Sequence, residues 1–116
     1  MKGSAMDIVL EISHADLVAA ILGGSARIID CNGTASFEAG HLPTAIDLES
    51  ASDLLAHLLP ADKSELIVVY CGGSTCTAYH KGADRVRALG HVNIRRYAAG
   101  ITGWKTAHLV SDCVPT

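Results

Sequence analysis

Short apolar segments alternate with amphipathic segments along the chain, and turn residues separate them. Five apolar runs predict strands over residues 8–12, 26–30, 45–48, 66–70 and 94–97. Apolar positions at helical spacing predict helices over residues 13–22, 53–59, about 78–89 and 103–109. Strands that alternate with helices are typical of a mostly parallel sheet covered on both faces. The pattern therefore predicts a single α/β domain.

Residues that start or stop helices mark the ends of the expected elements. Ser13 with Asp16 approximates a capping box, and Gly23 ends that helix. Pro60 ends the next helix and Gly90 the third. Inward-facing side chains are expected from Leu17, Val18, Ile21, Leu22, Leu54, Leu55, Leu58, Leu59, Ala78, Gly82, Ala83, Val86 and Leu89. Residues 32–43 are predicted to be a polar loop.

Composition narrows the class of protein. The 116 residues are 49% hydrophobic and 18% charged, which excludes a disordered chain and suits one domain with a real core. The net charge of −3 predicts no nucleic-acid partner. Four arginines are interpreted mostly as solvated surface, with an anion-steering role as the alternative: Arg85, Arg87, Arg95 and Arg96.

The apolar pattern predicts neither a membrane span nor a signal peptide. No apolar run reaches the roughly 18 residues of a membrane span, so no membrane partner is expected. Residues 1–6 are too short and polar for a signal-peptide core and are interpreted as a tag remnant or disordered segment. The domain is then expected over residues 7–116, in the cytoplasm.

Cys71 is the main candidate for chemistry. It follows the apolar run 66–70 and opens a turn that leads into a predicted helix. Free backbone N–H groups and the helix dipole at such a position favour an anion, and they lower thiol pKa values. We therefore expect a thiolate nucleophile in an anion cradle, with a small buried apolar residue as the alternative.

The remaining cysteines give no metal site. Cys31, Cys76 and Cys113 complete the four, and nothing indicates a secreted disulfide framework. Cys71 and Cys76 have zinc-compatible spacing, but no second pair supplies the other two ligands. We expect no metal.

Three segments together resemble the rhodanese-like domain. Residues 28–30 followed by 37–46 (FEAGHLPTAI) are similar to the family signature D-x-R…F-x-x-G-H-[IL]-P-G-A. The segment 68–71 ends in cysteine at the place of the active cysteine, and 97–104 (YAAGITGW) resembles G-G-x-x-x-W. The resemblance covers most of the chain, from about Ile12 to Trp104.

This resemblance implies a three-layer α/β domain with a central five-stranded, mostly parallel sheet. It also implies transfer of sulfur from a donor to a thiol or cyanide through a persulfide on Cys71, with no cofactor. Asp30 and His41 would support the site, His41 by hydrogen bonds that fix its loop. The partners would be small sulfur donors and thiol acceptors, and a partner protein is one further candidate; the chain would be a monomer or weak homodimer. The donor or persulfide would be held by Gly72, Gly73, Ser74, Thr75, Cys76 and Thr77.

The sequence also departs from the family pattern. Asn32 stands where arginine is common, Thr44 where glycine is usual, and Ala99 replaces the first glycine of the last motif. The cysteine loop carries no basic residue, which favours persulfide or polysulfide donors over the thiosulfate dianion.

Alternative functions follow from the same loop. Cysteine-dependent phosphatases and arsenate reductases need an arginine in the loop to bind the oxyanion, and none is present. A catalytically silent binding module is the stronger alternative.

Cys76 is either a resolving thiol that forms a disulfide with Cys71 or a side chain packed inward at the start of the helix.

Overall fold

The computed structural model describes residues 9–51 and 53–107. Its strands form one five-stranded parallel sheet in the order β1-β5-β4-β2-β3. The strands are β1 (Leu10–Glu11), β2 (Ala26–Asp30), β3 (Ile46–Asp47), β4 (Leu66–Tyr70) and β5 (Ile94–Arg96). The strand richest in buried apolar side chains, β4, lies at the centre, where helices on both faces of the sheet bury it.

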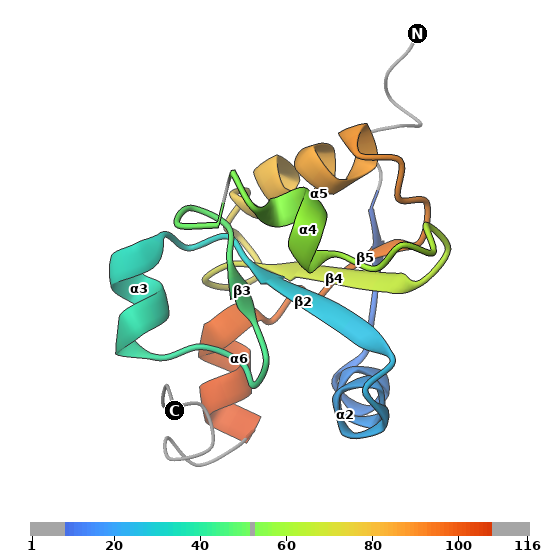
Figure 1. The fold of residues 1–116 in the computed structure, drawn as a ribbon. Helices are drawn as coiled ribbons and strands as arrows, with labels where there is room; N and C mark the ends of the chain where they lie inside the picture. The colour runs from blue at the N-terminus through green and yellow to red at the C-terminus, as the bar shows by residue number, and fades with distance from the viewer. Residues whose placement is uncertain (1–8, 52, 108–116) are drawn as a thin grey trace, which may run out of the picture.

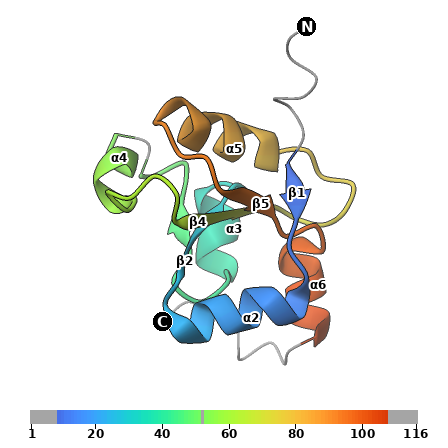
Figure 2. The ribbon, with the colours of Figure 1, turned by 90° about the vertical axis from the view of Figure 1, so that its right-hand side faces the viewer.

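Helices cover both faces of this sheet. They are α2 (His14–Gly23), α3 (Thr34–Ala39), α4 (Leu55–Leu58), α5 (Tyr79–Ala88) and α6 (Gly100–Ala107). Figures 1 and 2 show α4 and α5 on one face, α2 and α6 on the other, and α3 beside the sheet. The predicted α/β class and the central five-stranded parallel sheet are therefore confirmed.

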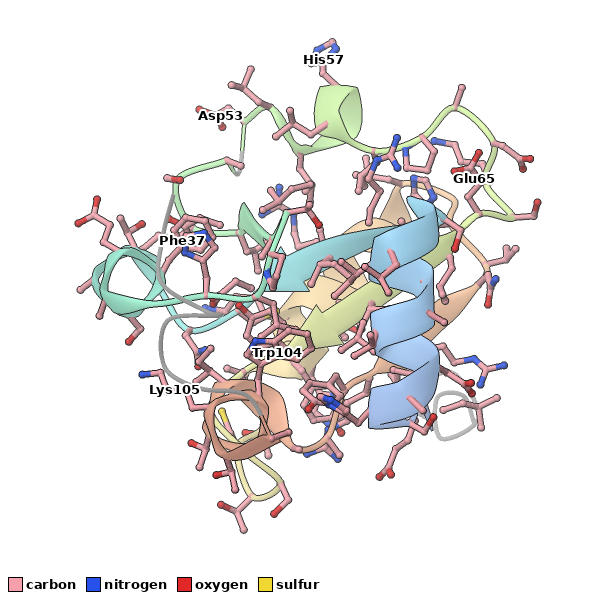
Figure 3. All side chains as sticks on the ribbon, turned by 90° about the horizontal axis from the view of Figure 1, so that it is seen from below. Phe37, Asp53, His57, Glu65, Trp104 and Lys105 are labelled. Carbon is pink, nitrogen blue, oxygen red and sulfur yellow. The ribbon has the colours of Figure 1, made fainter. Side chains whose placement is uncertain are left out.

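Two apolar clusters lie on the two faces because successive strand residues point in opposite directions. Val68 and Tyr70 pack with Leu17 of α2 and Trp104 of α6. Figure 3 shows Trp104 in the interior between α6 and α2. The opposite cluster contains Ile29, Leu48, Leu55, Leu59, Ile67, Val69, Ala83 and Val86. This alternation within β2 and β4 is why each strand can be almost wholly apolar.

One predicted loop contains a helix. Within the segment 32–43, residues Thr34–Ala39 form α3, which buries none of its side chains and so has no apolar period to predict it. Its start is held from outside: Thr34 N–H donates to Glu49 Oε1 (2.7 Å), and Thr34 Oγ1 donates to Asp47 Oδ2 (2.7 Å). The polar-loop prediction was therefore wrong for this segment.

Three leucines predicted to face inward are exposed. Leu22 is 83% exposed, Leu54 58% and Leu58 43%. Because α4 is a single turn, only Leu55 and Leu59 reach the core from it. The last helix begins at Gly100 rather than at 103, and the predicted positions 8, 108 and 109 lie outside the described residues.

No helix in residues 9–51 and 53–107 has the length and apolar character needed to cross a membrane.

The first turn of α6 bonds to the carboxyl end of β4. The N–H groups of Ile101 and Thr102 donate to the carbonyl oxygens of Cys71 (2.9 Å) and Gly72 (3.1 Å). These bonds satisfy amides that a helix start leaves free. Gly100 has φ of 62°, and a Cβ atom there would overlap the Cys71 carbonyl oxygen. Only glycine fits this approach.

We expect Gly100→Ala to destabilise the fold by about 2–4 kcal/mol, because it adds strain at positive φ and a backbone clash. Gly23→Ala is the matched control, since no atom lies within 4 Å of its added Cβ and its φ is not positive. Urea unfolding measures both variants. Equal stabilities for the two variants would contradict the assignment.

His91 gives the fold a pH dependence. It is 1% exposed, and within the described residues neither ring nitrogen has a hydrogen-bond partner. Burial, with a smaller contribution from Lys63, lowers its pKa. The unfolded chain therefore gains a proton near its ordinary pKa of about 6.5 while the folded chain stays neutral, so stability falls as pH decreases.

We expect His91→Phe to remove this component. Between about pH 7 and pH 5, the wild type should lose up to about 1.4 kcal/mol per pH unit more than the variant. Urea unfolding across that range measures the difference. Parallel pH profiles would show that His91 does not carry the effect.

Candidate active site

Cys71 lies directly after β4, at the carboxyl edge of the parallel sheet. Its side chain is 3% exposed, and the loop 72–78 leads from it into α5. Its sulfur accepts hydrogen bonds from the backbone N–H groups of Gly72 and Tyr79. Of the predicted donors 72–77, the Gly72 amide bonds to this sulfur, whereas Tyr79 is the first residue of α5 and lies beyond that range.

The loop folds back so that Cys76 meets Cys71. Cys76 N–H donates to the Gly73 carbonyl (3.1 Å), which closes a turn. The Cys71 thiol donates a hydrogen bond to the Cys76 sulfur, which also accepts from the backbone N–H groups of Gly72 and Ala78. Both cysteines are free thiols. Of the other predicted loop residues, Ser74, Thr75 and Thr77 are exposed.

The two thiols differ in their tendency to ionise. Burial, followed by the hydrogen bond to Cys76, raises the pKa of Cys71 to about 11. The hydrogen bond from Cys71 lowers the pKa of Cys76, with help from backbone amides and Arg96. The expectation of a lowered pKa at Cys71 was therefore wrong: burial outweighs the two amide donors, and of the two thiols the more exposed Cys76 ionises more readily.

Arg96 supplies the positive charge that the loop sequence lacks. It extends from β5, its Nη2 donates to the Ser74 carbonyl (2.8 Å), and its Cζ lies 4.1 Å from the centre of the Tyr79 ring. Glu11 lies on its other side, 3.9 Å from Nη1. The Arg96 side chain is only 14% exposed, so its interpretation as solvated surface was wrong.

The register of the sheet explains why Arg96 reaches the site. Val69 of β4 pairs with Arg96 of β5, so Arg96 starts two residues from Cys71 on the adjacent strand. Sequence reasoning left anion steering as the less favoured role of Arg96, because it searched the loop itself for a cation. The nearness of two strand ends in a parallel sheet was the available signal.

Asp30 joins the ends of β2 and β4 without reaching the thiol pair. Tyr70 Oη donates to Asp30 Oδ2 (2.5 Å) and accepts from Leu42 N–H (3.1 Å). Asp30 Oδ1 accepts from Asn32 N–H (2.8 Å). Burial raises the pKa of Asp30, and its hydrogen bonds oppose that rise. Through these hydrogen bonds Asp30 stabilises the strand ends beside the cysteine loop.

His41 holds the segment that follows α3. Its Nδ1 lies 2.7 Å from the Phe37 carbonyl oxygen and donates to it, and its ring stacks on Phe37 at 3.8 Å. These contacts agree with the expectation that hydrogen bonds from His41 fix this loop.

The departures from the family pattern have local consequences. Thr44 stands in place of glycine with φ of 65°, a conformation that costs a β-branched residue energy. Ala99 stands in place of the other glycine, and a Cβ atom on Gly103 would overlap its methyl group. Glycine at 103 therefore accommodates alanine at 99.

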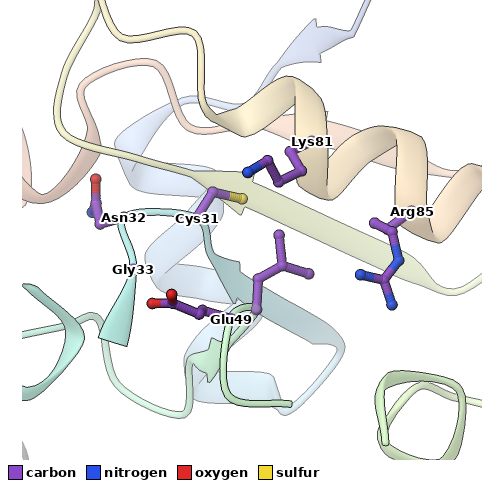
Figure 4. Close-up of a pocket in the computed structure, with 7 residues that line it drawn as sticks. Cys31, Asn32, Gly33, Glu49, Lys81 and Arg85 are labelled. Atoms are coloured by element: carbon purple, nitrogen blue, oxygen red, sulfur yellow. The ribbon is translucent and has the colours of Figure 1, made fainter. Parts of the chain in front are cut away.

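A separate cavity lies between α5 and the segments that follow β2 and β3. It has a volume of about 380 Å³ and is lined by Cys31, Asn32, Gly33, Leu48, Glu49, Lys81 and Arg85. In Figure 4, Lys81 and Arg85 extend from α5 on one side, with Asn32 and Glu49 on the other. Burial, followed by the nearby Cys71, raises the pKa of Cys31 to about 12, so Cys31 is a poor nucleophile.

Within the described residues, no three His, Cys, Asp or Glu side chains group so as to hold a metal ion.

The fold and the cysteine loop together define the class of protein. The model of the family described as "Rhodanese-like domain" matches residues 13–107. The chain therefore belongs to the rhodanese-like domain family.

Individual relatives have different names. The chain is 30% identical over 103 residues to the HTH-type transcriptional regulator Rv0324 of Mycobacterium tuberculosis, covering 87% of this chain and 44% of that protein. It thus spans less than half of this curated relative.

Two solved structures share the fold. The thiosulfate sulfurtransferase of Pseudomonas aeruginosa has a TM-score of 0.69 at 19% identity, over 85% of this chain and 19% of that one. The human single-domain sulfurtransferase TSTD1 has a TM-score of 0.67 at 18% identity, over 87% and 99%.

We expect Arg96→Gln to raise the pKa of Cys76, because it removes the cation beside that thiol. Alkylation of Cys76 by iodoacetamide at neutral pH should slow by about threefold or more. Arg95→Gln is the matched control, since Arg95 Nη1 contacts the Glu11 carbonyl (3.5 Å) instead. Fragmentation of the tryptic peptide 64–81, which contains both Cys71 and Cys76, gives the rate at Cys76 separately. Equal effects of the two substitutions would contradict the role of Arg96.

Proposed function

We propose that this chain is a sulfurtransferase that moves a sulfane sulfur from a donor to a thiol or cyanide acceptor through a persulfide on Cys71. Its main support is the surroundings of that sulfur. Cys71 is sheltered from water, faces two backbone N–H groups and donates its proton toward a second thiol. A persulfide anion formed there would meet the same donors.

The thiol pair provides the proton movements. As Cys71 attacks the outer sulfur of the donor, its proton passes to the Cys76 thiolate. A bond forms between Cys71 Sγ and the transferred sulfur, and the donor leaves with the electron pair of the broken bond, as sulfite or a thiolate. An acceptor thiolate then attacks the outer sulfur, and the departing Cys71 takes a proton back from Cys76.

The charges favour a persulfide or polysulfide donor over thiosulfate. Arg96 is a single cation, and Glu11 and the Cys76 thiolate already balance it in part. A second negative charge on the donor therefore finds no further partner at the loop. The loop sequence, which carries no basic residue, favours the same donors.

A catalytically silent regulatory module is the second candidate. The name of the Mycobacterium tuberculosis relative as a transcriptional regulator favours it. A regulatory module would bind a sulfur donor without cleaving it. Measuring cleavage of the donor therefore distinguishes this candidate from a sulfurtransferase.

With cyanide in excess, we expect the wild type to form thiocyanate, because cyanide captures the outer sulfur of the persulfide. Cys71→Ser should abolish the product, and Cys31→Ser should retain it, since the Cys31 thiol is not part of the loop. Polysulfide should react about tenfold or more faster than thiosulfate. Thiocyanate formation is measured colorimetrically.

Two results would contradict the sulfurtransferase proposal. One is unchanged thiocyanate formation by Cys71→Ser, which would remove Cys71 from the reaction. The other is no donor cleavage by the folded wild type, which would favour the silent module.

A further inference from the structure

The sulfurs of Cys71 and Cys76 accept hydrogen bonds from the same small group of backbone N–H groups. The N–H group of Gly72 bonds to both sulfurs, Tyr79 N–H bonds to Cys71, and Ala78 N–H to Cys76. The direct hydrogen bond between the two thiols places Cys76 against Sγ of Cys71. A thiol that merely filled space at the start of a helix would not need this arrangement.

The loop gives the pair room to come together. Gly72 and Gly73 carry no side chain between the two cysteines, and a Cβ atom on either would meet its nearest neighbour only at 3.8–3.9 Å. Ser74 and Thr75 are exposed, so a small shift of the turn displaces no core side chain. The short approach that a disulfide requires is therefore available.

We propose that Cys76 is a resolving thiol that converts the Cys71 persulfide into a Cys71–Cys76 disulfide when no acceptor takes the sulfur. This rests on the proposed function, because the persulfide must form first. Cys76 first passes the proton that it took from Cys71 to the outer sulfur of the persulfide. The Cys76 thiolate then attacks Sγ of Cys71 and forms the new S–S bond. The bond between Sγ and the outer sulfur breaks, and its electron pair leaves with the outer sulfur as hydrosulfide.

The choice of leaving group decides which sulfur is attacked. Attack on the outer sulfur would expel the Cys71 thiolate into a buried site that disfavours its charge. Attack on Sγ expels hydrosulfide, a better leaving group that departs into water.

A dithiol reductant reduces the Cys71–Cys76 disulfide. Two-step thiol exchange with a dithiol returns Cys71 and Cys76 to thiols and leaves the reductant as its own disulfide. The chain would then reduce sulfane sulfur to sulfide at the expense of the dithiol. In the absence of that reductant it would stop in an oxidised, inactive form.

The test is a single turnover with inorganic polysulfide, anaerobically and without acceptor. The wild type should lose the mass of two hydrogen atoms and release sulfide. Both cysteines lie in the tryptic peptide 64–81, so mapping places the disulfide. Cys76→Ser should gain one sulfur atom more slowly, because it lacks the base that takes the Cys71 proton. Once formed, its persulfide should last at least about tenfold longer than in the wild type. Dithiothreitol should restore the wild-type mass.

Control variants separate the pair from the other thiols. Cys31→Ser should behave as the wild type. Arg96→Gln keeps both cysteines and should lengthen the lifetime of the persulfide, whereas Arg95→Gln should not. Cys76→Ala replaces Cys76→Ser if that variant fails to fold.

The outcomes distinguish the two proposals. If the wild type and Cys76→Ser keep the added sulfur equally long, Cys76 is not a resolving thiol, and sulfur transfer still stands. If neither gains sulfur nor forms a disulfide, and thiocyanate is not made, the proposed sulfur transfer fails as well.

Discussion

The bond between the start of α6 and the end of β4 is the constraint on which the site depends. Two N–H groups of α6 donate hydrogen bonds to the carbonyl oxygens of Cys71 and Gly72. Gly100 allows the helix to approach the loop this closely because it has no side chain. The peptide group that follows the cysteine is thereby held from the far side of the loop. The loop can present its own N–H groups to sulfur because its carbonyl groups are bonded elsewhere. A helix distant in sequence thus sets the geometry of the nucleophile.

Burial disfavours the charged form of Cys71, and the second thiol of the loop ionises more easily. A sulfur with 3% exposure is protected from water, but its charged form is costly, and two amides do not offset that cost. Cys76 is more exposed and lies near Arg96, so it holds the charge more easily. When the pair loses one proton, Cys76 becomes a base beside the buried nucleophile. The same contact brings a thiolate to the sulfur that it could later attack.

The predictability of each element follows from how local its causes are. The apolar run 66–70 is a central strand because its own side chains require burial on both faces. In contrast, α3 begins where side chains of Asp47 and Glu49 hold Thr34, which no local pattern could indicate. Leu54 and Leu58 were predicted inward because a longer helix was assumed; a single turn orients fewer leucines toward the sheet.

By itself, the sequence determined the α/β order, the place of Cys71 after the central strand, and the presence of a second cysteine in a glycine-containing loop. These depend on hydrophobic period, on turn residues and on short spacings, all of which are local. Tertiary structure alone decided that Arg96 reaches the loop from β5, that the two thiols share a hydrogen bond, and that the pKa of Cys76 is lowered while that of Cys71 is raised. The physical reason is that a pKa depends on burial and on neighbouring groups in space, and both arise only when distant segments pack together.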